Sequence, residues 1–130
     1  MTDDVHASRR ERAAERLDAV GAAGLVCLPS RNLEYLTGFA EEPGDRHLFL
    51  VVPATSAASP DPALLVPALS EARLREATTV DDVRAWNDGD DPVTATRELL
   101  ADRGLDAGRL LVDDTMWATF SQDLRAAAPD

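Results

Sequence analysis

Two apolar runs, each closed by a proline, constrain the fold more than any other feature. Residues 25–28 read Leu-Val-Cys-Leu before Pro29, and residues 47–52 read His-Leu-Phe-Leu-Val-Val before Pro53. In the first run the apolar residues do not alternate with polar ones, which fits a strand buried on both faces. The second run is the strongest strand signal in the sequence. The two runs therefore predict a central sheet with helices packed on both sides.

Three further segments predict strands. Residues 63–66 (Ala-Leu-Leu-Val) follow the Ala-, Ser- and Pro-rich residues 54–62, a composition typical of an exposed hairpin connection. Residues 110–112 (Leu-Leu-Val) predict another buried strand, and the alternating residues 80–86 favour a strand near an edge. The sheet should therefore have about five strands.

Helical spacing of apolar residues recurs along the chain. The first helix is expected over residues 8–20, where Ser8 and Glu11 have the spacing of a capping box. Further helices are predicted over residues 70–77, over 92–103 before Gly104, and from residue 115 or 117 to 128. The fold class is thus α/β, a single domain over residues 1–130 whose mixed sheet of about five strands is flanked by helices on both faces.

The charge pattern excludes several partners. The net charge is −11, and all 13 basic residues are arginine. Nucleic acids and anionic membrane surfaces bind through clustered basic residues, so we expect neither as a partner. An acidic excess that is mostly aspartate, together with an apolar set rich in alanine and valine, is typical of proteins from halophiles, where salt screens such a surface. No signal peptide or membrane-length apolar run is seen, so a cytoplasmic location is predicted.

Candidate catalytic groups are few. A metal site typically needs three converging protein ligands, and the two histidines, His6 and His47, are expected at the surface. Adjacent strand residues point to opposite faces, so we interpret the aspartate pairs as solvated surface. These pairs are residues 81–82, 90–91 and 113–114. Cys27 is predicted to be a buried thiol, and the chain alone is expected to hold no cofactor and to be no enzyme.

The most distinctive string is Asn-Leu-Glu-Tyr-Leu-Thr-Gly-Phe, which begins at Asn32, just after the first strand. Asn32 is expected to bond backbone amides at the turn. Tyr35 and Leu36 are expected to pack a short helical turn onto the sheet. Gly38 permits a backbone angle that Phe39 could not adopt. Structural roles alone account for every residue of the string.

The string resembles the N-terminal domain of the creatinase, prolidase and Xaa-Pro aminopeptidase family, whose members carry Asn-x-x-Tyr-Leu-Thr-Gly-Phe after an Arg-rich helix and a short strand. The similarity continues in order over roughly residues 9–128, through the segments 49–52, 64–73, 83–86 and 112–114. The resemblance implies a ribonuclease H-like layering of helices on the sheet, and a non-catalytic domain of a homodimer that precedes a pita-bread catalytic domain. That domain would bind two divalent ions (manganese, cobalt or zinc) through two Asp, one His and two Glu, and this chain contains none of those ligands.

The resemblance also names a candidate substrate loop. In creatinase an aromatic residue and an arginine after the string reach toward the substrate carboxylate in the partner subunit's site. Arg46 has the matching spacing, but Gly44 replaces the aromatic, which favours a peptidase over a creatine-specific enzyme. Arg46 and the adjacent His47 are therefore the candidate substrate-binding residues. The alternative interpretation is that Arg46 is a loop arginine held in a salt bridge.

Two functions from different classes remain open. The first is a non-catalytic domain of a metal-dependent Xaa-Pro peptidase or creatinase-type hydrolase, which contributes dimer contacts and one wall of the active site. The second is a stand-alone α/β binding or assembly module that kept the fold without the enzyme. A further 220 to 250 or so residues in the reading frame would favour the first.

Overall fold

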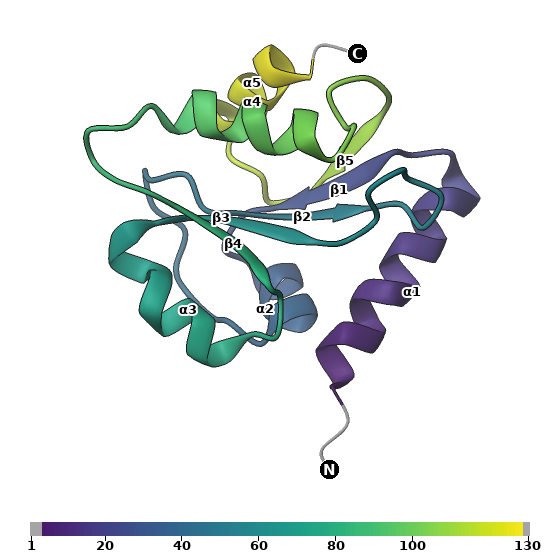
Figure 1. Cartoon of the computed structure of the whole chain (residues 1–130), viewed down its shortest axis with the longest axis horizontal. Coiled ribbons are helices and arrows are strands. Elements are labelled where there is room, and N and C mark those ends of the chain that lie inside the picture. The colour runs from purple at the N-terminus through teal and green to yellow at the C-terminus, as the bar shows by residue number, and fades with distance from the viewer. Residues whose placement is uncertain (1–3, 129–130) are drawn as a thin grey trace.

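A five-stranded sheet runs through the middle of the computed structural model, which describes residues 4–128 (Figure 1). The strand order is β4-β3-β2-β1-β5. β2 pairs antiparallel with β1 and β3, whereas β5 and β4 pair parallel with β1 and β3 respectively, so the sheet is mixed as predicted. The strands are β1 (Gly24–Cys27), β2 (Phe49–Pro53), β3 (Ala63–Pro67), β4 (Asp82–Trp86) and β5 (Leu110–Val112).

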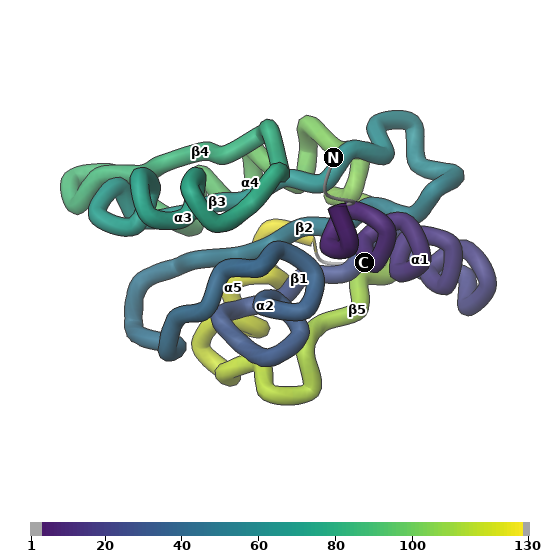
Figure 2. The backbone as a smooth tube through the Cα atoms, turned by 90° about the horizontal axis from the view of Figure 1, so that it is seen from below, coloured from purple at the N-terminus to yellow at the C-terminus, as the bar shows by residue number. Residues whose placement is uncertain are grey.

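Helices cover both faces of this sheet. The first face carries α1 (Val5–Val20), α2 (Arg31–Thr37) and α3 (Glu71–Ala77), with the short helix η1 (Ala68–Ser70) leading into α3. Figure 2 shows these helices from below, in purple, blue and teal. The opposite face carries α4 (Pro92–Asp102) and α5 (Ala118–Ala127) (Figure 1). The predicted α/β architecture is confirmed.

The core has two halves because successive strand residues point in opposite directions. Cys27 and Leu50 face α1, α2 and α3, whereas Val26 and Phe49 face α4 and α5. All of these side chains are at most 1% exposed, so β1 is covered on both faces, as predicted, and β2 is covered in the same way. None of the described helices has the length and apolar character needed to cross a bilayer.

Three details differ from the sequence prediction. α1 begins at Val5, because the carboxylate of Asp4 caps it by accepting from the amide of Ala7 at 2.9 Å. Ser8 therefore lies inside the helix and is not its cap. β5 is partly exposed, since as an edge strand it has only one neighbour. The last helix begins at Ala118.

The strand directions bring five chain segments to one edge of the sheet. The carboxyl ends of β1, β3, β4 and β5 meet the beginning of β2 there. This edge therefore gathers the start of α2, the loop before β2, η1 after β3, the turn after β4 and the turn after β5. The candidate site residues all lie in or beside these segments.

Candidate functional site

Asp113 ties the first and last strands together at this edge. Its side chain is buried, at 4% exposure, and it directly follows β5. One carboxylate oxygen accepts from the amide of Leu28 at 3.1 Å and from the hydroxyl of Ser30 at 3.0 Å, and the other accepts from the amide group of Asn32. The prediction that Asp113 belongs to solvated surface is therefore wrong, because three donors enclose its carboxylate.

Ser30 connects this carboxylate to the short helix α2. While donating to Asp113, its Oγ accepts from the amide of Leu33 at 3.1 Å and caps the helix. At the other end, Gly38 takes a left-handed φ of 84°, and its amide donates to the carbonyl of Glu34 at 2.8 Å. The predicted backbone role of Gly38 is confirmed, and α2 is fixed at both ends.

Two residues of the distinctive string behave differently from the prediction. The side chain of Asn32 donates to the Asp113 carboxylate instead of binding backbone amides, since Ser30 already occupies the cap. Tyr35 is 51% exposed and does not pack on the sheet, because it lies on the outer side of α2; Leu36, 5% exposed, packs inward as expected. The guanidinium of Arg9 lies 4.0 Å from the centre of the Tyr35 ring.

The candidate substrate loop, residues 40–47, is braced at its beginning. Phe39 is buried just before it, at 2% exposure, with the guanidinium of Arg73 lying 5.3 Å from its ring centre. The carboxylate of Glu41 pairs with Arg73 and accepts from the hydroxyl of Ser70 at 3.3 Å. The loop therefore leaves the core along a path fixed by η1 and α3.

Arg46 lies near the end of this loop, with its side chain 44% exposed. Its guanidinium pairs with the carboxylate of Asp88, which is 73% exposed and lies in the turn after β4. Such exposed pairs contribute only about 0–1 kcal/mol. The salt bridge weighed as the alternative role of Arg46 is thus present, but it is weak and open to solvent.

His47 is more enclosed than the sequence indicated, with a side chain only 12% exposed. Its Nε2 lies 2.6 Å from a carboxylate oxygen of Asp123 in α5. The rings of Phe49, Trp86 and Phe120 surround it edge-on, at centroid distances of 5.6, 6.4 and 4.9 Å. Trp86 also donates to the His47 carbonyl at 2.8 Å, so His47 anchors the loop to β4 and α5.

Cys27 is fully buried, as predicted. Burial raises the pKa of its thiol far above the usual value, and the nearby carboxylate of Asp113 raises it further. A thiol held neutral in this way is a poor nucleophile and a poor metal ligand. Within residues 4–128, no three His, Cys, Asp or Glu side chains come together as a potential metal site.

Comparison with known proteins addresses the family directly. The model of the family described as Creatinase/Prolidase N-terminal domain matches residues 9–130. The chain belongs to this family. A probable dipeptidase PepE from Mycobacterium tuberculosis is 38% identical over 92 residues, which are 68% of this chain and 24% of that protein.

Solved structures agree with the family assignment. A dipeptidase from Pyrococcus horikoshii superposes with a TM-score of 0.80 at 30% identity, covering 92% of this chain and 32% of that one. Dipeptidase PepE from Mycobacterium ulcerans superposes with a TM-score of 0.80 at 32% identity, covering 99% of this chain and 34% of that one. The creatinase/prolidase N-terminal domain of an Xaa-Pro dipeptidase from Streptococcus pyogenes superposes with a TM-score of 0.78 at 26% identity, with 94% of each chain covered.

The matched region is only 24% of the Mycobacterium tuberculosis PepE, and the chain covers 32% and 34% of the Pyrococcus horikoshii and Mycobacterium ulcerans dipeptidases. The similar dipeptidases continue well beyond the matched domain, which is consistent with a following catalytic domain.

Sequence reasoning missed the acidic partners of the site. The pairing of Asp113 with Asp114 in the sequence indicates surface, and no sequence pattern links Asp88 or Asp123 to the loop. A signal for Asp113 was present, since an aspartate directly after a parallel strand lies at the edge where the neighbouring strand also ends. Asp88 and Asp123 lie 42 and 76 residues from their partners, and no local pattern connects them.

Proposed function

We propose that this chain is the non-catalytic N-terminal domain of a metal-dependent Xaa-Pro peptidase or creatinase-type hydrolase. In this proposal it precedes a pita-bread catalytic domain, forms part of a cytoplasmic homodimer, and presents residues 40–47 to an active site of the partner subunit. Family membership supports the proposal, as do the dipeptidase names of relatives that are at least 30% identical.

The exposed guanidinium of Arg46 carries the proposal. It stands on a loop braced by Glu41 at one end and by His47 at the other, so its position is defined while its charge faces solvent. A guanidinium grips a carboxylate through two parallel hydrogen bonds. Because the pair with Asp88 is weak, the carboxylate of a peptide substrate could take the place of Asp88 at small cost.

His47 is the second candidate for substrate contact. Its ring is mostly enclosed, and its Nε2 already faces Asp123. We assign it chiefly the task of holding Arg46 in place, with any direct contact limited to its small exposed part.

The two divalent ions, manganese, cobalt or zinc, belong in this proposal to the catalytic domain. The described residues bring no three metal-binding side chains together, so their donor set does not fit such a centre. The tasks proposed for this chain are therefore to bind and orient the substrate and to support the assembly of the enzyme.

Substituting Arg46→Ala in the full-length protein tests the proposal. Loss of a charge-assisted contact costs about 1.5–3 kcal/mol, so kcat/KM for a dipeptide should fall roughly ten- to a hundredfold. The unfolding midpoint should hardly change, because the salt bridge to Asp88 is exposed.

Asp88→Ala is the matched control, since it breaks the same salt bridge and leaves the arginine in place. It should alter kcat/KM by less than about threefold, the equivalent of a weak surface interaction. Equal kinetic losses in the two variants, or none in Arg46→Ala, would leave Arg46 as a structural loop residue.

A further inference from the structure

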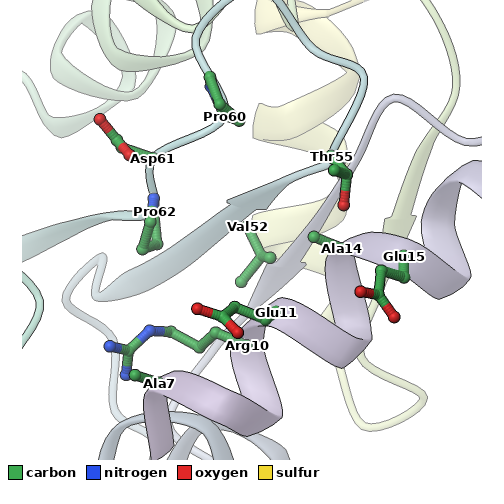
Figure 3. A pocket seen from close by; sticks show the side chains of 10 residues that line it. All are labelled: Ala7, Arg10, Glu11, Ala14, Glu15, Val52, Thr55, Pro60, Asp61 and Pro62. Carbon is green, nitrogen blue, oxygen red and sulfur yellow. The ribbon is translucent and has the colours of Figure 1, made fainter.

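A groove beside α1 is separate from the candidate substrate loop. It lies between α1 and the hairpin that joins β2 to β3, and it has a volume of about 410 Å³ (Figure 3). Ala14, Val52 and Pro62 give it a mainly apolar lining. This volume falls within the range of roughly 300–1,000 Å³ that is typical of small-ligand sites.

Hydrogen bonds fix the hairpin wall of the groove at both ends. Ser56 donates to the carboxylate of Asp18 in α1, from its amide at 3.2 Å and from its hydroxyl at 2.5 Å. At the other end, Arg103 Nε donates to the carbonyl of Asp61 at 2.8 Å. The groove is therefore formed before any ligand arrives, which lowers the entropic cost of binding.

The polar groups of the groove are mostly acidic. Glu11 and Glu15 lie one helical turn apart on α1, and Asp61 lies on the opposite wall (Figure 3). All three are exposed, and none forms a salt bridge with another residue of the described chain. These carboxylates outnumber the one cation that lines the groove, Arg10.

Arg10 does not satisfy these acids. It is 7% exposed, and its guanidinium donates to the carbonyl of Leu36 at 2.8 Å and to the hydroxyl of Thr79 at 3.3 Å. Burial lowers the pKa of Arg10 from its usual value, while the charges of Asp4 and Glu11 oppose that shift. Even with Arg10 charged, the groove keeps a net negative charge.

We propose that this groove binds a basic side chain, arginine or lysine, from a partner polypeptide in which an apolar residue stands beside it. The aliphatic stem and the apolar neighbour would cover Ala14, Val52 and Pro62. The cationic head would reach Glu11 and Glu15 at the rim. Long basic side chains combine an apolar stem with a charged end, and the groove offers a surface for each.

The test is a titration of the ¹⁵N-labelled chain with the blocked dipeptide acetyl-Leu-Arg-amide, followed by amide chemical shifts. The expected result is saturable shifts at Ala14, Val52 and Thr55. Acetyl-Leu-citrulline-amide, which has nearly the same shape without the charge, should bind at least about fivefold more weakly.

Paired variants locate the site. Glu11→Gln with Glu15→Gln should raise the dissociation constant of the arginine peptide about five- to tenfold. Glu76→Gln with Glu98→Gln, which removes the same charge from exposed positions on α3 and α4, should leave it unchanged. Equal weakening by both pairs, equal binding of the citrulline peptide, or shifts scattered over the acidic surface would each overturn the proposal.

Discussion

Replacing Asp113 should destabilise the domain more than replacing any other aspartate of the candidate site. Its buried carboxylate accepts from the amide of Leu28, the hydroxyl of Ser30 and the side chain of Asn32. Asp113→Ala leaves all three donors without their acceptor. Hydrogen bonds to a charged group contribute about 1.5–3 kcal/mol each, but water replaces some of them, so the expected loss is about 3–5 kcal/mol.

Asp113→Asn should cost less, because one oxygen can still serve Leu28 and Ser30. The new amide group then faces the amide of Asn32, so one hydrogen bond is lost, at about 1–2 kcal/mol. Adding Asn32→Asp to this variant reverses the pair and should recover part of the loss. Asp114→Asn, at the exposed neighbouring position, should stay within about 0.5 kcal/mol of the unmodified chain.

Urea unfolding followed by circular dichroism gives all four free energies. The order expected is Asp113→Ala as the least stable, then Asp113→Asn, then the reversed pair, with Asp114→Asn close to the unmodified chain. A loss of less than about 1 kcal/mol for Asp113→Ala would refute the reasoning, since the carboxylate would then contribute no more than an exposed one.

The remaining predictions concern the backbone, the charge and metal ions. Gly38→Ala should lower the free energy of unfolding by at least about 1 kcal/mol, because φ at Gly38 is +84° and an added Cβ would lie 3.0 Å from the carbonyl oxygen of Ala77. Gly44→Ala is the control in the same unfolding assay and should be nearly neutral, because an added Cβ there would have no atom within 4 Å. The unfolding midpoint should rise between 0.1 and 3 M KCl as salt screens the charge of −11, and a flat or falling midpoint would remove the halophile interpretation. Calorimetry with Mn²⁺, Co²⁺ and Zn²⁺ should find no stoichiometric site tighter than micromolar in this chain, and such a site would overturn the placing of these ions in another domain.

Much of the fold could be predicted because its signals are local. The run around Cys27 has no polar residue to turn toward water, so a strand covered on both faces follows from it alone, and the run around Leu50 is the strongest strand signal in the chain. Gly38 was identified for the same reason, since the conformation it takes is a property of one residue and its neighbours. The family resemblance rested on the order of such local signals and is confirmed.

The features that could not be predicted depend on distant pairs. Asp113 is buried because its donors come from the turn after β1 and the start of α2, more than 80 residues earlier. The carboxylate of Asp4, which caps α1, also accepts from the hydroxyl of Thr79, far along the chain. The setting of Arg46 and His47 likewise depends on Asp88 and Asp123, which only the folded chain brings to them.

The size and activity of the native polypeptide test the central claim most directly. An antibody raised against this chain can recover the protein from its own cells for mass measurement and for an assay of Xaa-Pro dipeptide hydrolysis. Because the chain spans 32% of the Pyrococcus dipeptidase, the account predicts a polypeptide of roughly three times this chain's mass that hydrolyses such dipeptides when supplied with divalent metal. A native polypeptide of 14.0 kDa with no associated dipeptidase activity would contradict the account and favour a stand-alone binding or assembly module.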